Sequence, residues 1–322
     1  MPDRIICRVL TGPTASGKSG FAMELAAQMG WDILCMDSMQ VYRRMNIGTA
    51  KPSAAEQKLV PHHLLDIRNP EESFSVSEYV TEAESLVREL YHAGKNVLFV
   101  GGTGLYLQAM MMPMGMGNVP ANPALREELN QLALTEEGKR ILHSRLEKTD
   151  PDTAAKLPLN DIRRTIRAIE VTEATGIPFS RQENRPDHSP FEWRVVSTAM
   201  DRNMLYDRIN RRVDQMVENG LIPEVQALLD LGLNDDCTAM QAIGYKEIVR
   251  AIRGTVTRND AIEQIKQESR RYAKRQLTWL RRNPDVCWLR WQSTPDLTRA
   301  VEHCLSLWQA PDAAGIPKEV EI

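Results

Sequence analysis

The sequence contains no run of about 18 apolar residues, the length that a membrane-spanning helix requires, so we expect no contact with a membrane. Cysteine is scarce as well. The five cysteines are scattered, odd in number and never spaced as C-x-x-C, which indicates neither a disulfide framework nor a zinc site and fits a reducing cytosol. There is no internal repeat, and no D-x-x-G or N-K-x-D motif follows a strand as it would in a GTPase.

Length and composition describe a globular chain. Its 322 residues, 42% apolar and 26% charged, suffice for one large or two ordinary domains with a real core. A glycine-rich loop begins only a dozen residues from the N-terminus, so we expect no secretory signal peptide and a cytoplasmic location. We also expect a monomer.

The net charge of −3 conceals an uneven distribution along the chain. Residues 246–282 carry eleven Lys and Arg against four Asp and Glu, which is +7 and leaves −10 for the remainder. The average argues against a protein that binds nucleic acid over its whole surface. The basic segment marks one place where it could.

The most specific motif follows the apolar run at residues 5–10 and has the form G-x-x-x-x-G-K-[ST], a cradle for phosphates. Its backbone N–H groups and the following helix N-terminus face bound oxyanions, Lys18 adds a positive charge, and the Ser19 hydroxyl can bind Mg²⁺. The residues of this loop are Gly12, Pro13, Thr14, Ala15, Ser16, Gly17, Lys18 and Ser19.

Strand-like apolar runs alternate with helical patterns, which predicts an α/β fold with a P-loop NTPase-like parallel sheet. The runs are 5–10, 33–36, 64–67, 97–100, 195–200 and 286–291. Between about residues 113 and 190 only helical patterns occur, which indicates a helical insertion in the core. We therefore predict a discontinuous core of residues 1–117 and 195–308, an insertion of residues 118–194, and a disordered tail of residues 309–322.

Ligands in parallel sheets bind at the carboxyl ends of the strands, so the residues after each strand are candidates for chemistry. Asp37 follows the second run, where a carboxylate can hold a metal-bound water or accept a proton; capping a helix is the alternative. Residues 101–104, which include Thr103, follow the fourth run and form either a substrate contact or a simple turn.

Basic side chains share one helix face at three places. Arg208, Arg211 and Arg212 could clamp a diphosphate or form a solvated face. Residues 266–282 carry a basic stripe with Trp279 beside it, and residues 163–167 carry a second cluster. Such stripes suit an RNA backbone and a stackable base, although a solvated face is again the alternative. The adjacent His62 and His63 indicate loop or core hydrogen bonds, and the Met-rich residues 110–117 indicate packing, a hinge or an apolar contact.

Several segments in order resemble the bacterial tRNA dimethylallyltransferases, also called isopentenyltransferases. The resemblance covers about residues 9–282, most of the chain. The segments that carry it are GPTASGKS at 12–19, DSMQVYRRMNIGTAKP at 37–52, PHHLLDI at 61–67, VGGTGLYLQA at 100–109, NDIRRTIRAIEV at 160–171, DRI at 207–209, AIGYKE at 242–247 and YAKRQLTWLR at 272–281.

The resemblance implies transfer of a dimethylallyl group from dimethylallyl diphosphate to N6 of adenine-37, in the tRNA anticodon loop, with release of diphosphate. The phosphate loop would then hold the prenyl diphosphate rather than ATP, with Mg²⁺ on Ser19. Adenine N6 is a poor nucleophile, so positioning, a base and stabilisation of the leaving group must supply the catalysis. The target base must also leave its stack.

The resemblance also assigns residues. It makes Asp37 the general base, places Thr103 at the reaction centre and makes Arg208 the contact to the diphosphate. Ser38, Met39 and Gln40 would receive the adenine. The residues in its tRNA-contacting segments are Arg126, Asp161, Ile162, Arg163, Arg164, Thr165, Gly244, Tyr245, Lys274, Arg275, Gln276, Trp279 and Arg281.

The chain differs from eukaryotic relatives because no Cys/His set for a C-terminal zinc finger is present, which favours a bacterial cytosolic role. Three alternatives have different expectations. A small-molecule kinase would need neither the basic segment nor the insertion, a transferase acting on free AMP would not need residues 246–282, and an NTP switch would show the GTPase motifs.

Overall fold

The structure is a computed structural model that describes residues 5–112, 119–182, 189–293, 295–309 and 317–322. Contacts divide the chain into two units, which are residues 1–111 with 190–322 (unit 1) and residues 112–189 (unit 2). Unit 2 therefore corresponds to the insertion predicted at 118–194, and both of its boundaries lie a few residues earlier in the sequence. Within the described residues, no helix is long and apolar enough to cross a membrane.

The described residues of unit 1 form a parallel sheet of seven strands in the order β3-β2-β4-β1-β5-β6-β7. The strands are β1 (Ile5–Thr11), β2 (Asp32–Cys35), β3 (His62–His63), β4 (Val97–Val100), β5 (Phe191–Met200), β6 (Val286–Trp291) and β7 (Glu319–Glu321). β1 pairs with β4 and β5, so the phosphate loop leaves the middle of the sheet. The predicted P-loop NTPase-like class is confirmed.

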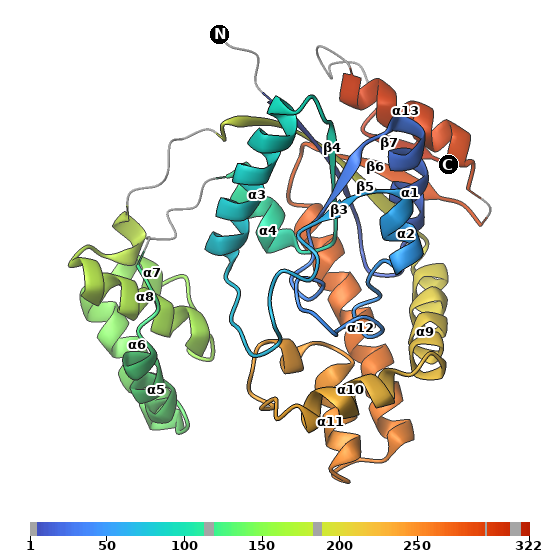
Figure 1. Cartoon of the computed structure of the whole chain (residues 1–322). Coiled ribbons are helices and arrows are strands. Elements are labelled where there is room, and N and C mark those ends of the chain that lie inside the picture. Colours follow the sequence, from blue (N-terminus) through green and yellow to red (C-terminus); the bar gives the residue numbers. More distant parts are fainter. Residues whose placement is uncertain (1–4, 113–118, 183–188, 294, 310–316) are drawn as a thin grey trace. The chain divides into compact units, whose positions relative to one another are not determined.

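Helices connect these strands. They are α1 (Lys18–Met29), α2 (Ala54–Leu59), α3 (Val76–His92), α4 (Gly104–Met111), α9 (Arg202–Glu218), α10 (Leu221–Asp230), α11 (Tyr245–Ile252), α12 (Arg258–Leu280) and α13 (Leu297–Gln309). In Figure 1, α3 and α4 lie on one side of the strands and α1 and α13 on the other. The helix faces that carry Arg208 to Arg212 and the basic residues from 266 onwards belong to α9 and α12.

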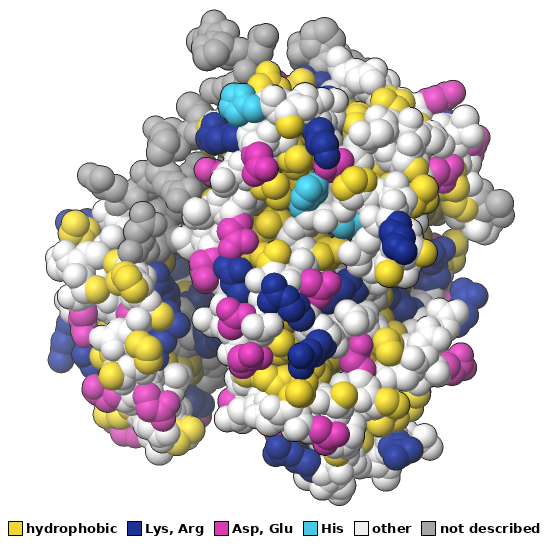
Figure 2. Space-filling view, viewed as in Figure 1, with side chains coloured by type: hydrophobic (Ala, Val, Ile, Leu, Met, Phe, Trp, Pro, Cys, Tyr) yellow, Lys and Arg dark blue, Asp and Glu magenta, His cyan; other side chains and the backbone are white. Residues whose placement is uncertain are grey.

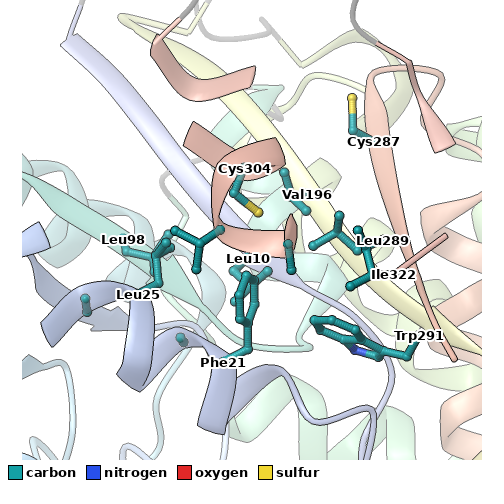
Figure 3. Packing of buried hydrophobic residues seen from close by; sticks show 14 of the residues in the cluster. Leu10, Phe21, Leu25, Leu98, Val196, Cys287, Leu289, Trp291, Cys304 and Ile322 are labelled. Carbon is teal, nitrogen blue, oxygen red and sulfur yellow. The ribbon is translucent and has the colours of Figure 1, made fainter. Parts of the chain in front are cut away.

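The main core lies between the sheet and the α1 and α13 layer. Leu10 and Val196 from the central strands pack with Phe21 and Leu25 of α1 and with Cys304 of α13 (Figure 3). A second core forms where α9 to α12 meet the loop after β2 and includes Tyr42, Val213 and Tyr245. This second core holds α9 and α12 close to the phosphate loop.

Unit 2 is helical, as the sequence predicts. It contains α5 (Pro123–Leu132), α6 (Glu136–Thr149), α7 (Pro151–Ala154) and α8 (Ile162–Thr175), around a core that includes Leu142 and Ile169. Asp161 caps α8 by accepting from the Arg164 N–H, and Gly176 ends the helix in the left-handed conformation with φ 70°.

Two elements differ from the predictions. The run at 64–67 is not a strand, because Leu64 and Asp66 adopt positive φ and only residues 62–63 pair with β2. The tail is not disordered where the structure describes it, since β7 pairs with β6 and the Ile322 side chain is 5% exposed. A buried apolar side chain and strand pairing outweigh the loop-like composition; residues 310–316 lie outside the described residues.

The histidines make hydrogen bonds as predicted. His62 Nδ1 bonds the Val60 carbonyl at 2.8 Å, and His63 Nε2 lies 2.8 Å from Asp32 Oδ2. Of the Met-rich cluster, Met110 is a buried residue of α4, and residues 113–117 lie outside the described residues.

The buried tail leads to a test of stability. Replacing Ile322→Ala should lower the free energy of unfolding by about 2 kcal/mol, because buried methyl groups are lost from the main core. Urea unfolding of the full chain measures this value. Leu231→Ala, at a side chain that is 57% exposed, is the matched control and should change it by less than about 0.5 kcal/mol. Equal effects of the two variants would mean that the tail does not pack in solution.

Candidate active site

The phosphate loop is held by close contacts to neighbouring strands. Gly12 adopts φ 145°, and a Cβ there would collide with the Thr198 hydroxyl at the end of β5. The Ser16 and Thr198 hydroxyls are 2.7 Å apart and hydrogen-bonded. Gly17, with φ 86°, precedes the first residue of α1. The loop therefore needs glycine at these two positions.

A cavity of about 350 Å³ opens beside this loop. It is lined by four basic side chains and by no carboxylate. The lining residues are Ala15, Gly17, Lys18, Ser19, Gly20, Arg208, Arg211, Arg212 and Gln215. The positive end of α1 adds to this charge, so the cavity suits a multiply charged phosphate compound.

Lys18 is the ionisable group most affected by this environment. Burial, followed by the positive charge of Arg212, lowers the pKa of Lys18 to about 8, while Asp37 acts in the opposite direction. Its ammonium group lies 3.4 Å from the Pro13 carbonyl oxygen. An anion bound next to Lys18 would raise this pKa and favour the charged form.

The two inner arginines of α9 have different roles. Arg208 donates from Nε to the Ala15 carbonyl at 3.0 Å, so it supports the loop as well as lining the cavity. Arg212 makes no hydrogen bond or ion pair with any described residue, and burial lowers its pKa. The sequence singled out Arg208 and left Arg212 as a member of the basic face. Arg212 and the terminal N–H groups of Arg208 have no hydrogen-bond partner among the described residues, so both side chains are available to an anion in the cavity.

Asp37 and Thr103 lie at the ends of the adjacent strands β2 and β4. Asp37 Oδ1 accepts from the backbone N–H of Met39 at 2.9 Å and of Gln40 at 3.3 Å, so it caps a turn rather than a helix. Asp37 Oδ2 has no hydrogen-bond partner among the described residues. Thr103 Oγ1 accepts from the Ser38 N–H at 3.1 Å, which joins the two strand ends.

Tyr272 of α12 is a neighbour of this pair that the sequence did not single out. Burial, followed by the negative charge of Asp37, raises the pKa of Tyr272, and its side chain lies beside Thr103. The helical spacing of α12 could have indicated it, because Tyr272 and Gln276 are four residues apart on the same face. No motif distinguishes a buried tyrosine at such a position from an ordinary core residue.

Both polar atoms of the Gln40 side chain form hydrogen bonds within the protein. Its Oε1 accepts from the Cys35 thiol at 3.1 Å, and its Nε2 donates to the carbonyl oxygens of Thr49 and Ala50 at 3.0 and 3.2 Å. Among the three residues predicted to receive the base, only Ser38 and Met39 have side chains without such bonds. Gln40 instead shapes the loop that follows β2.

Tyr245 and Gly244 also have internal roles. The Tyr245 ring is fully buried, its hydroxyl donates to Glu224 Oε1 at 2.6 Å, and Glu224 also accepts from the N–H groups of Ile47 and Gly48. The Gly244 N–H caps α11 through Glu247. The structure therefore gives Tyr245 a packing role and not the solvent-facing position that contact with RNA requires.

The basic stripe of α12 is only partly available. Lys266 is paired with Asp214 at 2.8 Å and Arg271 with Glu268 at 2.6 Å, whereas Lys274 and Arg281 are exposed and unpaired among the described residues. Arg275 is exposed and stacks over the Tyr272 ring. On the face in Figure 2, basic and acidic side chains are interspersed over unit 1. The exposed positive charge of α12 is thus local, as the overall charge indicates.

Trp279 is positioned by α4. A Cβ at Gly104 would lie 2.7 Å from the indole ring, and the indole N–H donates to Gln108 Oε1 at 3.3 Å. The ring is half-buried, so one side packs against the protein. It can offer only its remaining surface to a base.

In unit 2 the predicted RNA residues divide in the same way. Arg163 and Arg164 are exposed near the start of α8, whereas Ile162 is half-buried, Thr165 is buried and Asp161 caps the helix. Arg126 makes two bonds of 2.8 Å to the buried Glu170, which also binds Arg167 at 2.6 Å. Arg126 is therefore half-buried and held in one orientation.

These facts lead to a test of the Lys18 charge. As pH rises above about 8, free Lys18 loses its proton, so binding must take one up and affinity should fall by up to about tenfold per pH unit. The binding of inorganic diphosphate is measured by calorimetry from pH 6.5 to 9.5 for the Lys18→Met variant and for the unmodified chain. The ratio of the variant's dissociation constant to that of the unmodified chain should fall as pH rises above about 8. The ionisation of diphosphate cancels in the ratio. A ratio independent of pH would contradict the assignment.

A second test concerns Glu170. Burial alone would raise its pKa, but Arg126, the Asn122 N–H and Arg167 outweigh burial and lower it to about 2. Its contribution to stability is therefore complete above about pH 4.5 and is lost as pH falls towards 2. Glu170→Gln should destabilise unit 2 by roughly 3 kcal/mol at pH 7, seen as faster amide exchange in α5 and α8. Glu147→Gln, at an exposed side chain of α6, is the control; equal exchange in both variants would refute the prediction.

The chain is similar to known proteins over most of its length. The sequence matches the IPP transferase family over residues 40–283. It is 46% identical over 290 residues to the tRNA dimethylallyltransferase of Carboxydothermus hydrogenoformans, covering 89% of this chain and 92% of that protein. It is 46% identical over 289 residues to that of Geobacillus thermodenitrificans, covering 89% and 90%.

Solved structures give the same result. The tRNA isopentenylpyrophosphate transferase of Bacillus halodurans has a TM-score of 0.70 at 40% identity, covering 95% of this chain and 97% of that one. A eukaryotic dimethylallyltransferase acting on tRNA has a TM-score of 0.80 at 26% identity, covering 97% and 82%. The chain belongs to the IPP transferase family, and the two relatives described above are tRNA dimethylallyltransferases.

Proposed function

We propose that this protein transfers a dimethylallyl group from dimethylallyl diphosphate to N6 of adenine-37 in the anticodon loop of tRNA. The observation that carries the proposal is the separation of charge at the site. A cavity with four cations and no carboxylate lies beside Asp37, whose charge acts on both Lys18 and Arg212. During transfer, the anionic leaving group would lie in the cavity among the cations, and Asp37 would accept the proton on the other side of the transferred group.

The leaving group is stabilised in the cavity. As the bond between the prenyl carbon and the diphosphate oxygen breaks, its electron pair stays on that oxygen, where Lys18 and Arg212 neutralise the new charge. Arg208 keeps the loop in place through the Ala15 carbonyl and adds a third cation. These groups lie on α1, α9 and the loop, so little reorganisation is needed as charge develops.

Mg²⁺ fits this site as a partner of the substrate. Ser19 is exposed at the cavity, and Mg²⁺ commonly binds one or two protein oxygens together with phosphate oxygens and waters. When bound, it would add positive charge to the diphosphate. The Ser19 hydroxyl is the protein group that would hold it.

The acceptor amine meets Asp37. The N6 nitrogen forms the new bond to the prenyl carbon and gives up one proton, which Asp37 Oδ2 can accept because Oδ1 is already bound by the turn. Thr103, which joins the ends of β2 and β4, keeps the Asp37 turn in place and faces the same region. Ser38 and Met39 follow directly and offer a place for an unstacked base.

Binding of the RNA itself depends on separate residues. Lys274, Arg275 and Arg281 on α12, with part of the Trp279 ring, offer phosphate contacts and a stacking surface in unit 1. Arg163, Arg164 and Arg126 offer cationic groups in unit 2. We propose that both sets contact the tRNA and that the enzyme acts in the cytoplasm as a monomer.

The function is tested by incubating the protein with labelled dimethylallyl diphosphate, Mg²⁺ and unmodified tRNA, followed by digestion to nucleosides. Label in N6-isopentenyladenosine from the anticodon loop is expected. Asp37→Asn should reduce turnover by about 10²–10⁴-fold while tRNA affinity changes less than about twofold, because Asn retains the oxygen that caps the turn but cannot take the proton. A comparable loss of affinity would reassign Asp37 to binding. Phosphate transfer from ATP to a small metabolite, or prenylation of free AMP alone, would overturn the proposal.

A further inference from the structure

Gln276 of α12 lies between the phosphate loop and the glycine turn after β4. Its Oε1 accepts from the Thr14 N–H at 2.9 Å, and its Nε2 donates to the Gly102 carbonyl at 2.8 Å. The side chain is 7% exposed. One amide group therefore joins two loops that lie about 90 residues apart in the sequence.

The chemistry of this contact requires an amide. Thr14 offers a donor and Gly102 offers an acceptor, so the residue between them must accept on one atom and donate on the other. A carboxylate cannot donate, and an apolar side chain can do neither. Each buried backbone group would lose its partner if the amide were removed.

The Gln276 side chain also packs tightly against the glycine turn after β4. A Cβ at Gly102 would collide with Gln276 Nε2 and would lie 3.2 Å from the Gly12 carbonyl oxygen. The absence of a side chain at Gly102 is what allows α12 to approach both loops. Gln276 thus determines the spacing between the loop that carries Lys18 and the turn that carries Thr103.

The two faces of α12 differ. Gln276 lies on the buried face together with Ala273 and Leu280, whereas Lys274 and Arg281 are exposed. The resemblance that places residues 274–281 in a tRNA-contacting segment does not distinguish the two faces. The buried amide cannot reach RNA while both of its polar atoms bind the loops.

We infer that Gln276 is a positioning residue that holds the phosphate loop and the Thr103 turn in register, and that it makes no contact with RNA. The effect on the binding of inorganic diphosphate depends only on the cavity, whereas the KM and the tRNA measurements rest on the proposed function. Gln276 therefore acts on the donor site through Thr14 and Gly102, from the helix whose other face carries the exposed cations.

Gln276→Met tests this inference, because Met has a similar length and apolar volume but cannot make either hydrogen bond. The dissociation constant of inorganic diphosphate and the KM for dimethylallyl diphosphate should both rise about tenfold, while the tRNA dissociation constant should stay within about twofold. Gln267→Met is the matched control, since Gln267 is exposed on the same helix and has no hydrogen bond among the described residues. It should leave all three values unchanged.

A second variant covers the case in which Gln276→Met does not fold. Gln276→Glu keeps the shape and the acceptor for Thr14, and only its protonated form can donate to Gly102. Diphosphate affinity relative to the unmodified chain should therefore recover as pH falls from 8 to 5.5. A purely structural side chain would show no such recovery.

The outcomes separate the alternatives. Weaker tRNA binding with unchanged diphosphate binding in Gln276→Met would overturn the inference in favour of direct RNA contact. No change in either value, or no pH-dependent recovery in Gln276→Glu, would also overturn it. Since diphosphate binding needs neither tRNA nor prenyl transfer, failure of the proposed function would leave this measurement intact and distinguishable.

Discussion

Close packing around the phosphate loop is the constraint on which the rest of the site depends. Gly12 can approach Thr198 because it has no side chain, and the Ser16–Thr198 hydroxyl pair then ties the loop to β5. Lys18 begins the helix that follows, and Arg208 bonds the Ala15 carbonyl. Because each cation of the cavity is placed relative to this loop, their charges converge on one small volume.

The cations of the cavity and the carboxylate of Asp37 are kept apart, and this separation is what suits the site to group transfer. Asp37 acts electrostatically on Lys18 and Arg212, yet no ion pair joins them in the described part of the chain. A direct salt bridge would neutralise the base and occupy the cations that a leaving diphosphate needs. The turn instead binds Asp37 through the Met39 and Gln40 N–H groups, which orients the carboxylate without using up a cation.

Long helices connect this site to surfaces at which RNA could bind. α12 presents Tyr272 and Gln276 inward to the loops and Lys274 and Arg281 outward, so one rigid element carries both functions. α9 does the same for the cavity, because Leu205, Ile209 and Val213 are buried on one face while the arginines of the other face reach the phosphate loop. The spacing of apolar residues in each helix determines which side chains point to which function.

The sequence by itself determined the α/β class, the phosphate loop and the helical insertion, and it singled out Asp37 and Thr103 as candidates, because these depend on local periodicity and on motifs whose residues are contiguous. Only the tertiary structure decided that Arg208 also supports the phosphate loop while Arg212 lines the same cavity, that Tyr245 and Gln276 face inward, and that Ile322 packs in the core. Each of these is a contact between segments far apart in the chain. Helical spacing indicates which side chains share a face, but what that face meets depends on neighbours that the local sequence does not specify.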